Sequence, residues 1–148
     1  RWPMLRERSW DRCGLCEVYC RTEHSHSKDI IKAFKKESPR PLPRIHVGRK
    51  DEVCFAIQCR HCTEPWCVYS CLSGAMHRDT VTGAVIIDED KCIGCWTCIL
   101  ACPYGALVRD KDRKVVAKCD LCPKHEIPVC VINCPNEALI LSMEGEER

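Results

Sequence analysis

Short apolar runs separated by turn-forming residues are the commonest pattern along the chain. Three pairs of such runs predict strand–turn–strand units, at residues 44–55, 76–87 and 106–116. In the last two units the turn residues, 79–83 and 110–113, lie between apolar flanks. Plain surface loops would not need apolar residues on both sides, so the pattern favours small antiparallel hairpins.

A helical pattern interrupts the hairpins at residues 27–37. Ser27 offers a cap, and Ile30, Ile31 and Phe34 fall near one side of a helix while the lysines fall toward the other. The pattern predicts a short amphipathic helix. Its lysine face is interpreted as solvated, with docking of a partner as the alternative.

Three prolines follow this helix, Pro39, Pro41 and Pro43, and they prevent its continuation. An extended connection is therefore expected, leading into the hairpin at 44–55, which is expected to turn at Gly48. The hairpins and short helices together predict an α+β fold.

The cysteine content changes this picture. Of the 148 residues sixteen are Cys, whereas Leu, Ile, Val and Phe together number only 33. A core this thin, spread over many loops, indicates that something other than side chains fills the interior. Small cysteine-rich chains are usually either disulfide scaffolds or metal proteins, and the spacing of the cysteines distinguishes the two.

The cysteines fall into four groups, and three of these groups end in versions of one phrase. The shared endings are Cys71-Leu-Ser-Gly-Ala-Met, Cys102-Pro-Tyr-Gly-Ala-Leu and Cys134-Pro-Asn-Glu-Ala-Leu, which indicates an internal repeat. Cys54 alone stands outside the groups. The groups are Cys13, Cys16 and Cys20; Cys59, Cys62, Cys67 and Cys71; Cys92, Cys95, Cys98 and Cys102; and Cys119, Cys122, Cys130 and Cys134.

The third group has the bacterial ferredoxin spacing, with cysteines at positions 92, 95, 98 and 102. Three thiolates, each separated from the next by two intervening residues, can wrap one cubane if the backbone curls tightly. Gly94 permits a close approach to the inorganic sulfides. Zinc sites use separated pairs of ligands, disulfides in such tight loops would not cross-link distant chain, and a redox dithiol needs one such pair. The spacing therefore favours 4Fe-4S clusters.

These motifs resemble the polyferredoxin-type electron-transfer subunits that accompany molybdenum or tungsten oxidoreductases, carbon monoxide dehydrogenases and hydrogenases, typified by the dimethylsulfoxide reductase iron–sulfur subunit. The match is most specific from Gln58 to Leu139, including Gln58-Cys-Arg-His-Cys62 and Lys118-Cys-Asp-Leu-Cys122-Pro. The resemblance implies two fused ferredoxin-like dicluster modules. One would be residues 59–107, and the other residues 1–58 plus 108–148 with the helical insert.

The resemblance also implies how the cysteines share four 4Fe-4S clusters, because the fourth cysteine of a group ligates the neighbouring cluster in this family. The implied ligand sets are set A, Cys92, Cys95, Cys98 and Cys71; set B, Cys59, Cys62, Cys67 and Cys102; set C, Cys119, Cys122, Cys130 and Cys20; and set D, Cys13, Cys16 and Cys134.

The first group departs from the ferredoxin spacing. Aligned on its ending, its missing first ligand falls at Trp10, which cannot bind iron. Set D would then leave one iron vacant unless another residue fills the position. Cys54 brings the sixteen cysteines to four full sets and is the expected ligand, with a small buried core residue as its other interpretation. A histidine such as His24, a ligand from a partner, or a three-iron cluster also stays open.

The charge of the chain is consistent with clusters. The formal charge of +2 treats sixteen thiols as neutral, and four cubanes of roughly −2 each would bring the holoprotein to about −6. The 23 Lys and Arg then balance cluster charge, and a nucleic-acid partner is not expected.

No apolar run is long enough to span a bilayer and no secretory signal opens the sequence. A cytoplasmic chain is therefore expected, although Arg1 as first residue leaves a removed segment open.

Residues for substrate chemistry are missing from the sequence, which has no phosphate loop, nucleophile elbow or acid–base constellation. His61, between two cysteines, is interpreted as a packed or sulfur-bonding side chain. We expect a non-catalytic subunit of anaerobic metabolism that relays single electrons between another redox carrier and a catalytic subunit of molybdenum or tungsten, flavin, carbon monoxide dehydrogenase or hydrogenase type. A free polyferredoxin shuttle is the alternative, disfavoured by the helix and prolines between Ser27 and Arg44. A zinc-stabilised interaction module is the third interpretation.

Overall fold

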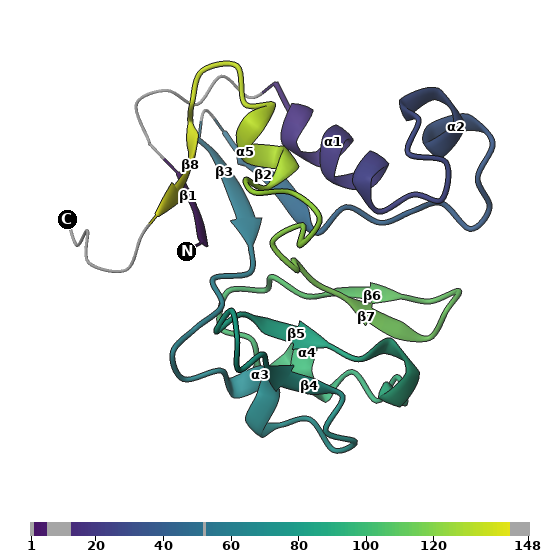
Figure 1. The fold of residues 1–148 in the computed structure, drawn as a ribbon, viewed down its shortest axis with the longest axis vertical. Helices are drawn as coiled ribbons and strands as arrows, with labels where there is room; N and C mark the ends of the chain where they lie inside the picture. Colours follow the sequence, from purple (N-terminus) through teal and green to yellow (C-terminus); the bar gives the residue numbers. More distant parts are fainter. Residues whose placement is uncertain (1, 6–12, 52, 143–148) are drawn as a thin grey trace.

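The chain folds into two halves, each made of short helices and two-stranded antiparallel sheets (Figure 1). This computed structural model describes residues 2–5, 13–51 and 53–142. The mixture of helices and small antiparallel hairpins confirms the expected α+β class.

One half, the terminal half, is built from the beginning and the end of the described chain. Its elements are β1 (Trp2–Leu5), α1 (Leu15–Glu23), α2 (Ile30–Lys35), β2 (Ile45–Lys50), β3 (Val53–Gln58), α5 (Val129–Ile132) and β8 (Leu139–Ser142). The other half, the central half, comprises α3 (Trp66–Tyr69), β4 (Met76–Arg78), β5 (Val85–Ile87), the 3-10 helix η2 (Glu89–Lys91), α4 (Thr97–Ala101), β6 (Val108–Asp110) and β7 (Val115–Ala117).

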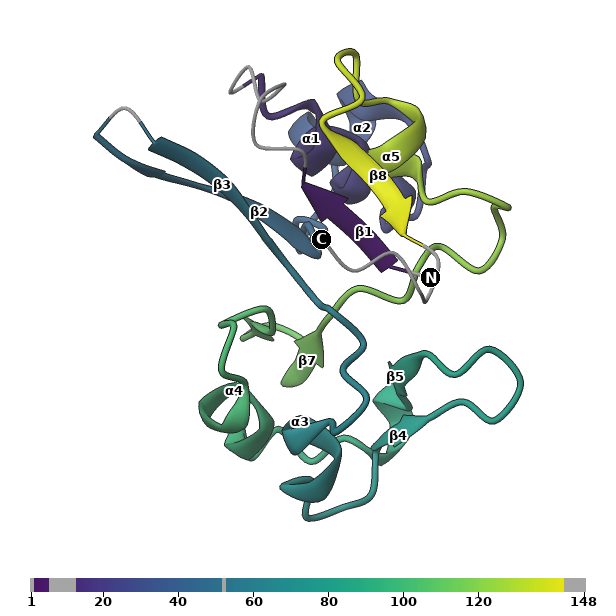
Figure 2. The ribbon, with the colours of Figure 1, turned by 90° about the vertical axis from the view of Figure 1, so that its left-hand side faces the viewer.

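The terminal half depends on contacts between segments that are far apart in the sequence. β1 pairs with β8 in antiparallel register, with Trp2 opposite Ser142, and the two strands lie side by side in Figure 2. Helix α1 packs against α5. Their buried core combines cysteines with aliphatic residues: Cys16, Cys20, Ile45, Cys130 and Leu139. The sequence pattern had indicated no strand at β1.

The central half has its own core, formed by Met76, Val85, Cys98, Leu107 and Val116. Val116 belongs to β7, so the β6–β7 hairpin packs with the central half although it follows residue 107, the expected module boundary. Val85 of β5 belongs to the same core as Val116.

All three predicted hairpins are present, but the first one turns later than expected. Gly48 lies within β2, opposite Phe55, and not in the turn. A Cβ added at Gly48 would meet the Phe55 ring at 2.5 Å, so glycine leaves room for that ring. The turn includes Asp51, whose φ of 53° is left-handed. Asp is among the residues that tolerate this conformation.

The predicted helix at 27–37 is shorter than expected and has a different cap. Helix α2 begins at Ile30, and the carboxylate of Asp29 accepts a hydrogen bond from the Lys32 amide at 2.8 Å. The predicted cap, Ser27, instead donates its hydroxyl to Glu37. An aspartate next to the first turn satisfies the same orphan amides as a serine and adds a favourable charge.

The buried side of α2 also differs from the prediction. Ile30 and Ile31 are exposed, whereas Ala33 is fully buried. Phe34 is half-buried beneath the Arg21 guanidinium, 4.7 Å from the ring centroid. The helix contacts α1, and the residue that it buries is Ala33 and not either isoleucine.

Ion pairs join the two halves. Arg44, which precedes β2, places its guanidinium 2.7 Å from Asp120 and 3.8 Å from Glu89 of η2. Glu89 in turn lies 2.9 Å from Arg113 in the β6–β7 turn. The network links a segment of the terminal half to two segments of the central half. Among the described residues, none of the helices is long and apolar enough to cross a membrane.

Candidate metal centres

The sixteen cysteines are all free thiols. Many lie in loops, and others lie within the short helices: Cys16 and Cys20 in α1, Cys67 in α3, Cys98 in α4 and Cys130 in α5. In the second and third groups, a short helix that includes the third cysteine leads to the fourth. This helix separates the fourth thiol from the loop that holds the first two. The arrangement therefore lets one group serve two neighbouring sites, as the ferredoxin spacing requires.

Set B is gathered around one cavity. Cys59 and Cys62 come from the loop after β3, Cys67 from α3 and Cys102 from the end of α4, and all four line the cavity together with apolar residues that include Val85. Burial raises the pKa of Cys67, and the charges of Cys59 and Cys102 raise it further. The raised pKa favours the neutral thiol, and deprotonation of all four cysteines in this apolar cavity needs a cation or a metal cluster to balance the charge.

Set A adjoins set B. The pKa of Cys98 is raised to about 11, first by burial and then by the charges of Cys71, Cys67, Cys92 and Cys95. Cys67 is a member of set B, so Cys98 lies within electrostatic reach of both sets. Cys95 is exposed, and a hydrogen bond from the Thr97 hydroxyl at 3.5 Å lowers its pKa.

Gly94, in the loop of set A, is required by packing against protein backbone. Its φ is +66°, and a Cβ at this position would lie 2.5 Å from the carbonyl oxygen of Lys114. The loop between Cys92 and Cys95 therefore rests on the β6–β7 turn. The sequence had suggested a different neighbour, the inorganic sulfides, for the same residue.

Set C lies at the junction of the two halves. Burial raises the pKa of Cys119 to about 12 and that of Cys122 to about 11. Beyond burial, the charges acting on Cys119 include those of Cys20, in set C, and Cys59, in set B. Burial also raises the pKa of Cys130, helped by Cys119, Cys20, Cys122 and Cys16. Cys16 belongs to set D, so set C adjoins both its neighbours.

Set D is assembled from the two ends of the terminal half. Burial raises the pKa of Cys16 to about 12, and the nearby thiols of Cys13 and Cys134 add to that rise. Cys13 is exposed. Trp10, where the ferredoxin spacing would place the missing ligand, lies outside the described residues.

Cys54 lies on β3, half-buried and opposite Arg49 of β2. Side chains two residues apart on a strand share a face, so Cys54 and Ala56 lie on the same side of the hairpin. Ala56 packs against the core cluster that contains Cys16. Cys54 therefore lies on the side of the hairpin that faces this core.

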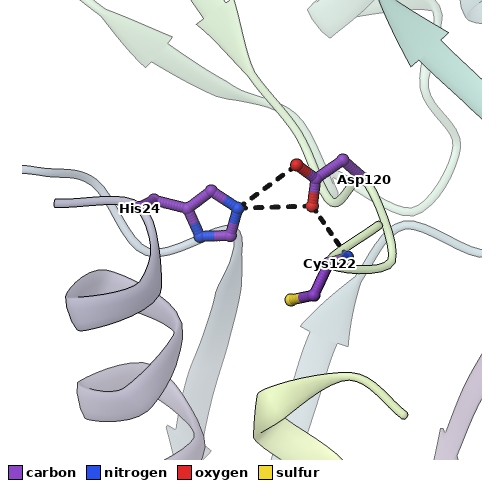
Figure 3. Close-up of side chains that lie close together, drawn as sticks. All are labelled: His24, Asp120 and Cys122. Carbon is purple, nitrogen blue, oxygen red and sulfur yellow. Dashed lines mark hydrogen bonds and ion pairs between the residues drawn. The ribbon is translucent and has the colours of Figure 1, made fainter. Parts of the chain in front are cut away.

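A histidine and an aspartate meet beside set C (Figure 3). The Nε2 atom of His24 lies 3.2 Å from Asp120, which also accepts hydrogen bonds from the Cys122 amide at 3.0 Å and from Arg44 at 2.7 Å. On its other side, His24 Nδ1 lies 2.7 Å from the carbonyl oxygen of Cys20. His24, Asp120 and Cys122 could together approach a metal ion. Because Cys20 and Cys122 both belong to set C, we interpret the cluster of side chains as a brace between the α1 end and the loop of that set.

The electrostatics of this brace favour an ion pair. Burial alone would lower the pKa of His24, but hydrogen bonds to Asp120 and Cys20 raise it to about 9. Asp120 has a pKa well below its usual range despite burial, because His24 and Arg44 stabilise the carboxylate. Sequence reasoning had found no metal spacing around His24, and residues that lie 96 positions apart carry no local signal of contact.

His61 and Lys118 both bond to the backbone of Val85 in β5. Lys118 is only 1% exposed, and its ammonium donates to the carbonyl oxygen of Val85 and, at 2.8 Å, to that of Cys119. The Val85 amide donates to His61 Nδ1 at 3.1 Å. Burial, reinforced by the Lys118 charge, lowers the pKa of His61 to about 3, so the imidazole is neutral at physiological pH.

The donor atoms fit an iron–sulfur cluster. Thiolate sulfur is the ligand that such clusters require, and backbone amides stabilise its charge. Amide donors already point at cysteine sulfurs here: Met76 to Cys71 at 3.3 Å, Arg44 to Cys20 at 3.2 Å, and His61 to Cys59 at 3.4 Å.

The fold and the thiol sets together define a small iron–sulfur protein. The chain belongs to the 4Fe-4S dicluster domain family, whose model matches residues 51–144. Electron transport protein HydN of Escherichia coli strain K12 is 36% identical over 144 residues, covering 86% of this chain and 79% of HydN. An iron-sulfur protein of Rhodospirillum rubrum is 33% identical over 147 residues, covering 86% and 74%.

A third relative matches a shorter region. The probable anaerobic dimethyl sulfoxide reductase chain YnfG of Escherichia coli strain K12 is 44% identical over 89 residues, covering 57% of this chain and 43% of YnfG. These relatives confirm the expected class: the chain is an iron–sulfur electron-transfer protein that binds 4Fe-4S clusters.

Proposed function

We propose that the chain relays single electrons through four 4Fe-4S clusters that lie in the order A, B, C, D. The carrying observation is the continuity of the thiol sets. Cys67 of set B packs against the core cluster that contains Cys98 of set A, and Cys16 of set D shares a core cluster with Cys20 and Cys130 of set C. The charge of Cys59 raises the pKa of Cys119, which supports set B as the neighbour of set C.

The two ends of this row reach the surface. Cys95 of set A and Cys13 of set D are exposed, whereas in sets B and C no cysteine is exposed. Electrons would enter at one end and leave at the other. A protected middle and accessible ends are what a relay between two partners needs.

The halves correspond to two proposed ferredoxin-like modules. Sets A and B take all eight ligands from residues 59–102, in the central half. Sets C and D take theirs from the first and last cysteine groups, in the terminal half. The β6–β7 hairpin packs with the central half, which supports drawing the boundary of that module after β7.

Cys54 is the proposed fourth ligand of set D. The strand face that it shares with Ala56 supports this choice, because Ala56 packs against the core cluster that contains Cys16. His24 is disfavoured, because it lies at the far end of α1 from Cys13 and is engaged with Cys20 and Asp120. His24 follows Cys16 by eight positions along α1, a rise of about 12 Å.

A catalytic oxidoreductase subunit is the proposed partner. One relative is named as a chain of a probable anaerobic dimethyl sulfoxide reductase, which supports a multi-subunit complex for this chain as well. Molybdenum or tungsten, flavin, carbon monoxide dehydrogenase and hydrogenase types all need such a relay.

Anaerobic purification followed by iron and sulfide analysis and a redox titration monitored by electron paramagnetic resonance tests the proposal. Four cubanes correspond to about sixteen iron per chain, and four one-electron components are expected. A protein with only two one-electron components and about eight iron would hold clusters in one half alone, and the proposed relay through four clusters would be wrong. Mass spectrometry of the native complex identifies the partner.

A further inference from the structure

His61 has a buried nitrogen for which the described part of the chain offers no hydrogen-bond partner. The residue is only 6% exposed, and its Nε2 atom is the unsatisfied one. A buried polar atom without a partner costs about 1–3 kcal/mol, so native structures normally supply an acceptor or a donor for it. The acceptor for this nitrogen therefore has to come from something other than these residues.

The tautomer of His61 follows from its other nitrogen. The Val85 amide donates to Nδ1 at 3.1 Å, so Nδ1 carries a lone pair. A neutral imidazole has a single N–H, which must then be on Nε2. The unsatisfied atom is a hydrogen-bond donor, and it needs an acceptor.

Both backbone polar groups of Val85, the residue that sets this tautomer, are engaged. Val85 pairs with Arg78 across β4 and β5, and the next pair is bonded through the Asp79 amide and the Ala84 carbonyl at 2.8 Å. In an antiparallel ladder bonded and non-bonded pairs alternate, so the polar groups of Val85 point away from β4. The amide meets His61 and the carbonyl meets Lys118. Lys118 is thus a positioning residue for the imidazole.

Sulfur atoms lie close to His61 on both sides along the chain. The residue lies between Cys59 and Cys62, and its own amide donates to Cys59 Sγ at 3.4 Å. Both cysteines line the cavity of set B. A cluster at this position carries negative charge on its sulfurs, which accept hydrogen bonds readily.

We propose that His61 Nε2–H donates a hydrogen bond to a sulfur of the cluster that set B would hold, and that this bond raises the reduction potential of that cluster. The inference rests on the assignment of a cluster to set B. The reduced cluster has one more negative charge than the oxidised one, so a donor stabilises the reduced form more. Set B is next to set C in the proposed row, so its potential controls transfer between the two halves.

Two substitutions separate the two nitrogens of His61. An asparagine reaches the Nδ1 position and can accept from Val85, but it has no donor at the Nε2 position. A glutamine reaches the Nε2 position and can donate there. With His61→Asn, the ratio of reduced to oxidised set B cluster at a fixed potential should fall about five- to tenfold. Tenfold corresponds to about 59 mV for one electron. With His61→Gln it should change less than about twofold.

The measurement is a redox titration of the holoprotein by electron paramagnetic resonance, with iron analysis of every variant. The set B signal is the one altered by Cys62→Ser. His26→Asn, at an exposed histidine, is the matched control and should leave every potential unchanged. Full iron content with no shift in His61→Asn overturns the inference, as does a shift confined to a different cluster.

The wild-type holoprotein provides a second readout that does not depend on assembly of the variants. With histidine labelled with ¹⁵N in the imidazole ring only, electron–nuclear double resonance of the reduced set B cluster should detect a coupled ring nitrogen, which separates Nε2 from the His61 amide that donates to Cys59. Absence of a coupled ring nitrogen overturns the hydrogen bond even if all clusters are present. If Cys62→Ser alters no signal and removes no iron, the cluster assignment itself is wrong, and both proposals fail together.

Discussion

The two halves of the molecule hold their thiols in different ways. The central half takes eight cysteines from one stretch, residues 59–102, whereas the terminal half combines cysteines from 13–20 with cysteines from 119–134. A ligand set that closes a long loop costs more conformational entropy than one that closes a short loop. The terminal half offsets this cost with contacts of its own, namely the β1–β8 pair, the α1–α5 contact and the His24–Asp120 brace. Ligand sets whose cysteines are close in sequence are specified by spacing, whereas sets whose cysteines are far apart also depend on tertiary contacts.

Removal of iron should have the largest effect and should abolish the difference between the halves. Chelation under reducing conditions leaves buried thiols without ligands and a thin aliphatic core, so we expect loss of cooperative unfolding across the whole chain. Circular dichroism during thermal unfolding, before and after chelation, measures this. A cooperative transition in the iron-free protein would show that the core is sufficient by itself.

Substitution of Cys54 tests the incomplete set of the terminal half. With Cys54→Ser we expect altered resonance from one cluster and the loss of about one to four iron, while the signals of the central half stay unchanged. Ala56→Ser is the matched control on the same strand face and should retain all iron. Unchanged iron and spectra in Cys54→Ser would leave Cys54 as core packing.

The glycines of the central half allow a comparison within it. Gly94 and Gly74 both have positive φ, but only Gly94 has a neighbour, the Lys114 carbonyl, where a Cβ would be. Gly74→Ala should reduce the free energy of unfolding by about 1 kcal/mol through backbone strain. Gly94→Ala should reduce it by about 3 kcal/mol, because the steric clash adds to the strain. Chemical denaturation of both holoproteins measures the difference, and equal losses would mean that the loop of set A relaxes freely.

Asp120→Asn should have the smallest effect of the four and should act at the junction. The neutral amide no longer balances His24 and Arg44 but can still accept the Cys122 amide hydrogen bond, so we expect the free energy of unfolding to fall by about 1 kcal/mol. Asp112→Asn, at an exposed aspartate of the β6–β7 turn, serves as the control and should stay within about 0.5 kcal/mol. If the two variants had the same denaturation midpoint, a structural role for the brace would be contradicted.

The sequence alone determined the features that depend on neighbours along the chain. The hairpins at 76–87 and 106–116 follow from apolar runs on either side of a turn. The cluster class follows from cysteines separated by two or three intervening residues. Both signals are local, because a strand–turn–strand unit and a cluster loop each close within about a dozen residues.

The tertiary structure decided which distant residues meet. The pairing of β1 with β8, the contact between His24 and Asp120, and the neighbour of Gly94 all join segments that carry no periodic relation to one another. The cap of α2 is Asp29 and not the expected Ser27, whose hydroxyl bonds instead to Glu37 beyond the other end of the helix. Spacing specifies which thiols can share a cluster, but only tertiary packing brings His61 and Lys118 to the backbone of Val85.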